Sequence, residues 1–337
     1  MKNVMKAATL ESKFPLLAVE NGCIVSKEAD VTVAFRVELP ELFSVTGSEY
    51  EAIHSAWHKA VKVLPEYSIV HKQDFFIEEK YRPETDRDDL SFLSRSFERH
   101  FNERPFLNHF CYLFLTKTTK ARSRQESTFS TLCKGRLVPK EIEDRETVTR
   151  FLEAVGQFEK IMNDSGLVTL RRLTTDEITG TERSAGIVEK YLSLSQHDTT
   201  VLKDIQLNPE EMRIGDDILC LHTLSDTEDL PGKVATDSRY ERLSTDRSDC
   251  RLSFAAPVGL LLDCNHCYNQ YIFIDDHGEN LKRFEQTARN MHSLSRYSRS
   301  NQINKAWIEE YLNEAHSKGL TSVRCHCNVM AVSYTHL

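Results

Sequence analysis

The chain has 337 residues, and its 43 lysines and arginines against 51 aspartates and glutamates give a net charge of −8 at pH 7. Only 12 glycines and 9 prolines are present, which excludes collagen-like and Pro/Gly-rich low-complexity chains and favours regular secondary structure. The longest apolar run, at 255–262, spans about eight residues, whereas a membrane-spanning helix needs about 20. We therefore expect neither a transmembrane segment nor, since the N-terminus has no apolar core of signal-peptide length, a secreted protein.

Three strands are predicted at the start of the chain. Apolar residues at 14–20 and 23–26 flank Asn21-Gly22, a dipeptide that favours a tight hairpin turn because both positions adopt positive φ. Apolar and polar residues then alternate over 31–39, which is typical of a strand with one buried face.

Helices and further strands follow. Thr46 and Glu49 have the spacing of a capping box and predict a helix at 47–64. In the same stretch we expect a strand at 67–77, a charged loop at 78–90, a helix at 92–101 and a strand at 111–116.

The second stretch begins near residue 144 with an apolar stripe at helical spacing. Its predicted elements are a helix at 144–166, a strand at 167–173, a helix at 175–194 weakened by Gly180 and Gly186, and a strand at 218–224. Residues 225–249 are polar and longer than an ordinary connection, so we expect a functional loop or a domain edge there.

The third stretch returns to strands and ends in helices. Its predicted elements are strands at 254–262 and 267–275, helices at 278–294 and 304–317, and a strand from Thr321. On the last helix we expect a buried face formed by Trp307, Ile308, Tyr311, Leu312 and Ala315.

These patterns predict an α+β fold of two or three small sheet-and-helix units, with no P-loop domain. The expected units are an N-terminal α+β unit at 1–120, a second α+β unit at 121–225 and a strand-helix-helix stretch at 226–331.

Motifs for nucleotide or hydrolytic chemistry are absent from the sequence. The one Gly-Lys pair, Gly232-Lys233, lacks the other residues of G-x-x-x-x-G-K-[ST], and G-x-S-x-G, H-E-x-x-H and G-x-G-x-x-G do not occur. We therefore assign no catalytic, cofactor-binding or metal-binding residues.

Nine cysteines, an odd number in a chain with no signal peptide, do not suggest a disulfide framework. Most are expected to be reduced and buried. The pairs Cys264/Cys267 and Cys325/Cys327 could together form a four-thiolate zinc site if the fold brings them together. The alternative is that they are structural thiols.

Residues 282–305 form a basic segment with six lysines and arginines against the single acid Glu285. Such a segment could meet nucleic-acid phosphates or an anionic membrane, or it could be an ordinary solvated helix face.

Six stretches of the sequence together resemble the N-terminal part of TraG-type conjugative-transposon ATPases, the energising ATPases of conjugative type IV secretion. The stretches lie at 14–46, 92–120, 173–182, 219–232, 241–259 and 279–316. The resemblance rests on whole segments and extends to about Ala331.

The resemblance implies a non-catalytic N-terminal region that serves oligomer contacts and docking to membrane-complex partners during DNA transfer. The resemblance also implies a motor domain after this region, outside the present sequence. ATP and Mg²⁺ are then expected to bind only in that motor domain. The resemblance further implies a cytoplasmic location, peripheral at the inner membrane, with secretion-machinery proteins as partners and a homo-oligomer for the full-length protein. Nucleic acid is a weaker candidate partner, through 282–305.

The last six residues, 332–337, read VSYTHL, which is also the translation of a sequencing-library transposase end sequence. We expect them to be an adapter-derived tail, with the natural reading frame continuing after Ala331. The alternative function left open by the sequence is a self-contained zinc or redox protein that uses Cys264, Cys267, Cys325 and Cys327.

Overall fold

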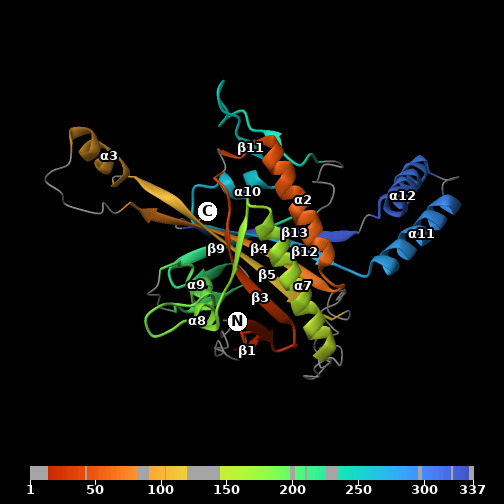
Figure 1. Cartoon of the computed structure of the whole chain (residues 1–337), viewed down its shortest axis with the longest axis horizontal. Helices are drawn as coiled ribbons and strands as arrows, with labels where there is room; N and C mark the ends of the chain where they lie inside the picture. Colours follow the sequence, from red (N-terminus) through yellow and green to blue (C-terminus); the bar gives the residue numbers. More distant parts are fainter. Residues whose placement is uncertain are drawn as a thin grey trace, which may run out of the picture.

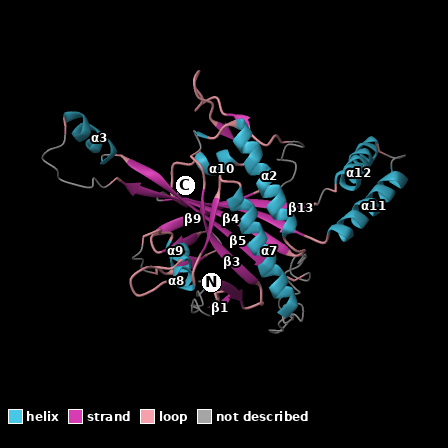
Figure 2. Ribbon diagram, in the orientation of Figure 1, coloured by secondary structure: helices cyan, strands magenta, loops and turns pink. Residues whose placement is uncertain are grey.

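The computed structural model describes residues 14–41, 44–81, 91–102, 104–119, 145–197, 202–208, 211–224, 234–294, 298–319 and 322–333. Within these ranges a large antiparallel sheet is combined with helices, as Figures 1 and 2 show, which confirms the α+β class. No helix of these ranges is long and apolar enough to cross a membrane.

The strands are β1 (Leu16–Glu20), β2 (Cys23–Ser26), β3 (Val31–Glu38), β4 (Ser68–Lys80), β5 (Pro105–Lys117), β6 (Thr169–Arg172), β7 (Ile205–Leu207), β8 (Met212–Ile214), β9 (Asp217–Thr223), β10 (Ser238–Arg239), β11 (Arg251–Leu252), β12 (His266–Ile274) and β13 (Val323–Ser333). The helices are α2 (Gly47–Val63), α3 (Phe92–Asn102), α7 (Arg145–Asp164), α8 (Thr175–Thr179), α9 (Ile187–Ser193), α10 (Ala256–Leu260), α11 (His277–Leu294) and α12 (Arg299–Lys318).

The main sheet has eleven strands in the order β1-β2-β3-β5-β4-β12-β13-β9-β8-β7, with β6 beside β3. Every described pair is antiparallel. P-loop domains are instead built on parallel strands joined by helices. Strands from all three expected stretches join this one sheet: β12 of the third stretch pairs with β4 of the first, and β13 of the third stretch pairs with β9 of the second.

The N-terminal elements form as their sequence predicts. Asn21 and Gly22 both have positive φ, at 52° and 72°, and they close the β1–β2 hairpin. At the start of α2 the Thr46 hydroxyl accepts from the Glu49 amide, while the Glu49 carboxylate accepts from the Thr46 amide at 2.7 Å.

One face of the sheet packs against α2 and α7, which lie side by side in Figure 2. Four residues of α7 at helical spacing are fully buried there: Phe151, Val155, Phe158 and Met162. They meet β3 and β5 side chains such as Phe35 and Leu113, which alternate with residues of the other face. This is the main apolar core of the protein.

A second core lies on the opposite face, beneath α8 and α9. The single helix predicted at 175–194 is divided into these two helices. Gly180 has φ 88°, and a Cβ on Gly186 would lie 2.3 Å from the Gly180 backbone nitrogen. The chain therefore folds back tightly at this point, and only glycines permit that approach.

The strand predicted at 254–262 is wrong. The chain forms the short helix α10 there, preceded by β11, and Gly259 of α10 packs against the ring of Tyr268. A short apolar run is compatible with either a buried strand or a buried helix, and Pro257 in the first turn is well suited to a helix.

Two predicted strand lengths differ from the structure. β4 and β5 each have 13 residues, because they pair with one another well beyond the apolar segments at 67–77 and 111–116.

On α12, Ala315 is buried and Trp307 is 66 % exposed, so the predicted buried face is wrong at Trp307.

Two elements lie at opposite ends of the long axis of the molecule in Figure 1. One is α3, which the β4–β5 hairpin carries. The other is the α11–α12 helical hairpin, whose base is fixed by a bidentate pair between Arg324 and Asp275 at 2.6 and 3.0 Å.

Several sequence expectations concern residues at or outside the described ranges. Val332, in the expected tail 332–337, is buried and pairs with Leu219 of β9, whereas 334–337 lie outside the described residues. Of the expected loop 225–249, residues 225–233 also lie outside, and β10 pairs with β11 near its end.

Candidate functional site

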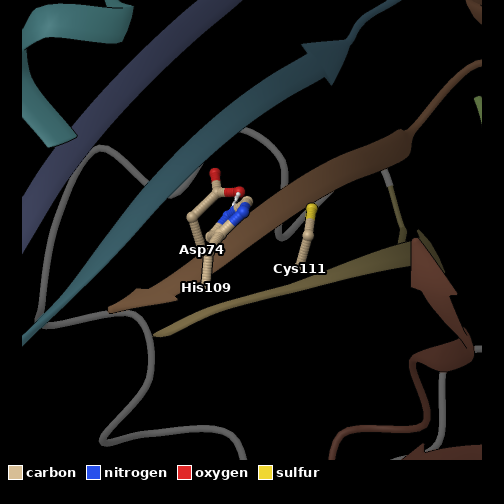
Figure 3. Close-up of side chains that lie close together, drawn as sticks. All are labelled: Asp74, His109 and Cys111. Carbon is tan, nitrogen blue, oxygen red and sulfur yellow. Dashed lines mark hydrogen bonds and ion pairs between the residues drawn. The ribbon is translucent and has the colours of Figure 1, made fainter. Parts of the chain in front are cut away.

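Asp74, His109 and Cys111 form a polar cluster on the two longest strands (Figure 3). Asp74 of β4 is paired directly with Cys111 of β5, and His109 precedes Cys111 by two residues. Alternate residues of a strand share a face, so the three side chains project together. Their oxygen, nitrogen and sulfur atoms all lie within 4.8 Å of one another.

Lys72 completes this cluster from β4, two residues before Asp74. Its ammonium forms an ion pair with Asp74 Oδ2, while His109 Nε2 donates to Asp74 Oδ1 at 2.8 Å. The Asp74 side chain is only 5 % exposed. Both of its carboxylate oxygens thus have partners, as a buried charge requires.

The electrostatics of the cluster favour a charged carboxylate and a neutral thiol. Burial alone would raise the pKa of Asp74, but the Lys72 charge and the hydrogen bonds from His109 and Lys72 lower that pKa to about 2. Burial lowers the pKa of Lys72, but the nearby Cys111 and Asp74 outweigh it, so that its pKa is raised. Burial strongly raises the pKa of Cys111, which makes it an unreactive thiol at neutral pH.

Aromatic rings support the cluster on one side. Phe76 stacks between His109 and His266, with ring centroids 4.7 and 4.6 Å away. The two nitrogens of His266 lie 2.7 Å from the carbonyl oxygens of Cys264 and Gly259, which joins α10 to the sheet. The surroundings are therefore packed and well connected.

The donor set of Asp74, His109 and Cys111 could hold a transition metal such as zinc, which accepts carboxylate, imidazole and thiolate ligands. A metal ion there would compete with the Lys72 ammonium for Asp74 and would require Cys111 to lose its proton. The charges of Asp74 and Lys72 already satisfy each other as an ion pair. Because the Cys111 thiol is neutral, the cluster does not present an activated nucleophile.

Three of the four cysteines considered for a zinc site lie on strands and are divided between the two faces of the sheet, whereas Cys264 precedes β12. Cys267 is opposite Met330 across β12 and β13, whereas Cys325 and Cys327 are opposite Ile272 and Gln270. Because faces alternate along a strand, Cys267 points away from the other two. Among the described residues these cysteines do not assemble into one ligand group.

The basic segment 282–305 lies on the α11–α12 hairpin, apart from 295–297, which are outside the described residues. Some of its charges are already paired: Arg289 lies 3.6 Å from Glu285, and Lys305 lies 3.3 Å from Glu309. These contacts are typical of a solvated helix surface.

No residue of the Asp74 cluster was predicted from the sequence as a site residue. The pattern His109-x-Cys111 on an apolar strand was a visible signal, since it places two ligand-type side chains on one face. Asp74 could not be added without the register of β4 against β5.

Comparison with known families gives a partial match. A family model described as "Domain of unknown function, B. Theta Gene description (DUF3875)" matches residues 3–55, which include β1, β2, β3 and the first half of α2. The comparison with curated proteins gives no match.

Proposed function

We propose that the chain is a non-catalytic docking region of a conjugative-transfer ATPase, which contributes oligomer contacts and attachment to the membrane complex during DNA transfer. The observation that carries this proposal is the resemblance of six separate stretches to the N-terminal part of TraG-type ATPases. The proposed partners are secretion-machinery proteins at the cytoplasmic face of the inner membrane, and the proposed site of ATP and Mg²⁺ is a separate motor domain.

The distribution of apolar surface supports a docking role. Large exposed apolar side chains occur on α3 and on α12, where Ile303 and Trp307 are exposed, and also around α10, at Phe254, Val258, Leu260 and Leu261. Exposed apolar clusters of this kind typically mark interaction surfaces. The Asp74 cluster, by contrast, has its charges paired and its thiol neutral.

A zinc or redox protein built on Cys264, Cys267, Cys325 and Cys327 is the alternative function. It would require the sulfurs to converge, whereas β12 and β13 place Cys267 on the other face of the sheet from Cys325 and Cys327. This register favours the docking function over the alternative.

Two measurements test the proposal. In a donor strain, deletion of the coding sequence is expected to abolish conjugative transfer, and the wild-type gene is expected to restore it. The purified chain is expected to show no saturable binding of an ATP analogue. Normal transfer by the deletion strain would contradict the conjugative role, and ATP hydrolysis by the purified chain would contradict a non-catalytic region.

A further inference from the structure

The end of the β4–β5 hairpin leaves the main sheet as a two-stranded ribbon. β12 pairs with β4 only as far as Phe76, and β3 pairs with β5 only from Cys111 onward. Beyond these points Ile77–Lys80 and Pro105–Asn108 pair with each other alone. We call these two segments and α3 the β4–β5 arm; it projects at one end of the molecule in Figure 1.

α3 carries a concentration of exposed apolar side chains. Phe92 and Leu93 are each 77 % exposed, and Phe97, Phe101 and the nearby Phe106 are exposed as well. None of the eleven residues of α3 is buried. Water-exposed phenylalanines at this density are unfavourable unless another surface covers them.

Three of these apolar side chains occupy one side of the helix, whereas Phe92 lies about 100° around the helix axis from Leu93, on the side that carries the arginines. Leu93, Phe97 and Phe101 recur every four residues, and the rings of Phe97 and Phe101 lie 4.5 Å apart. Tyr81, at the end of the ribbon, donates from its hydroxyl to Glu98 at 3.2 Å and lies edge-on to Phe101. The arm therefore holds α3 in a defined orientation, in which Phe101 contacts the ribbon while Leu93 and Phe97 are the more exposed side chains of the apolar side.

The charges of α3 lie away from this apolar side. Arg95 and Arg99 are one turn apart and fall on the opposite part of the helix surface. A helix with phenylalanine and leucine on one side and arginine on the other is typical of helices that lie flat at a membrane interface. Long arginine side chains reach the headgroups while the aromatic rings enter the acyl boundary.

We propose that α3 of the β4–β5 arm inserts its apolar side into the interface of a phospholipid bilayer. This inference rests on the proposed docking function and names the lipid surface as a partner of the chain. Residues 82–90, which connect the ribbon to α3, carry four acids against two bases. The charges near α3 are therefore mixed, and apolar insertion supplies most of the binding.

Vesicle flotation tests the proposal with the purified protein. Vesicles of phosphatidylcholine, with and without phosphatidylglycerol, are expected to bind the wild type, and binding is expected to persist in about 0.5 M salt, where surface charges are screened. The double variant Leu93→Ser/Phe97→Ser, which removes two side chains of the apolar side, should weaken partitioning by about tenfold or more. These two side chains are 77 % and 59 % exposed, so the substitution should leave the circular dichroism spectrum unchanged.

A matched control replaces two similarly exposed apolar residues elsewhere. Leu17→Ser/Leu207→Ser, at residues that are 67 % and 73 % exposed, is expected to bind vesicles as the wild type does. A tryptophan reporter locates the contact: Phe97→Trp in a Trp307→Phe background should show a blue-shifted emission when vesicles are added, because the indole enters an apolar environment.

Four outcomes would overturn the inference: no binding by the wild type, equal loss in both double variants, loss of binding in high salt, or no blue shift. Sedimentation tests a second copy as the occupant. Self-association that depends on Leu93 and Phe97, without vesicle binding, would assign the surface to a protein contact. If conjugative transfer requires the gene but the protein binds no vesicles, the proposed docking function is retained and only the bilayer is excluded as its partner.

Discussion

Buried polar side chains of β4 are held by neighbours on adjacent strands. On one face Asp74 is paired with Lys72 and His109. On the other face His71 donates from Nε2 to Asn269 Oδ1 at 2.9 Å, and Asn269 in turn donates to Asn328 at 3.0 Å. These contacts connect β4, β12 and β13 through side chains, in addition to their backbone ladders. Removal of a single partner from such a network leaves an unsatisfied group behind.

Replacement of Asp74 tests the ion-pair network. Asp74→Asn should lower the free energy of unfolding by about 3 kcal/mol, because the Lys72 charge loses its counterion in a largely buried setting. The double variant Lys72→Met/Asp74→Asn should recover much of that loss. Urea denaturation measures both, with Asp217→Asn, which breaks a more exposed pair with Lys203, expected to cost less than about 1 kcal/mol.

The same network has a pH dependence of known sign. The pKa of Asp74 is about 2 in the folded protein, below the value of about 3.9 expected for the unfolded chain. Its contribution to stability is therefore complete above about pH 4 and disappears as the pH falls towards 2. The advantage of the wild type over Asp74→Asn should shrink in that window, and a constant advantage down to pH 2 would contradict the low pKa.

His71 predicts a second, separate pH effect. Burial lowers the pKa of His71 to about 4, whereas the unfolded value is about 6.5. The unfolded chain therefore binds more protons between these values, and stability falls as the pH decreases from 6.5 to 4, by up to about 3 kcal/mol. His71→Gln should flatten this part of the stability curve, while His54→Gln, at an exposed position of α2, should not.

At the scale of elements, local sequence signals succeeded where they were strong. The Asn21-Gly22 turn, the capping box of α2 and the apolar stripe of α7 each predicted the element that forms. They failed where tertiary contacts decide: Gly180 and Gly186 split a helix, the apolar run at 254–262 forms α10, and mutual pairing extends β4 and β5. Such outcomes depend on neighbours that are distant in sequence.

The cap of α2 gives a prediction at this scale. Thr46→Ala removes the hydroxyl that accepts from the Glu49 amide and should destabilise the protein by about 1 kcal/mol. Thermal unfolding measures the change, and Thr46→Ser should keep most of the wild-type stability because its hydroxyl can still cap. A Thr46→Ala variant as stable as the wild type would show that α2 is held by packing alone.

At the scale of the whole molecule, the sequence predicted the α+β class but could not predict the strand order. β12 lies between β4 and β13, so strands that are almost 200 residues apart in the chain are neighbours in the sheet. Nothing in a single sequence specifies such long-range pairing, because apolar strands are compatible with many partners. The Asp74 cluster was missed for the same reason.

The position of the exposed apolar residues also emerges only at this scale. The apolar spacing of 92–101 predicted the helix, but a helix of this kind normally packs on its own domain. In the structure it lies on the β4–β5 arm, and the α11–α12 hairpin with the exposed Trp307 lies at the other end (Figure 1). This arrangement supports the docking function proposed above.

A mating assay tests that central claim most directly. A donor strain that lacks the gene is complemented with the wild type, with the arm variant Leu93→Ser/Phe97→Ser or with the control Leu17→Ser/Leu207→Ser, and the frequency of DNA transfer is measured at equal protein levels. We expect the arm variant to lose most of its transfer activity and the control to match the wild type. Wild-type transfer by the arm variant would contradict the assignment of docking to α3.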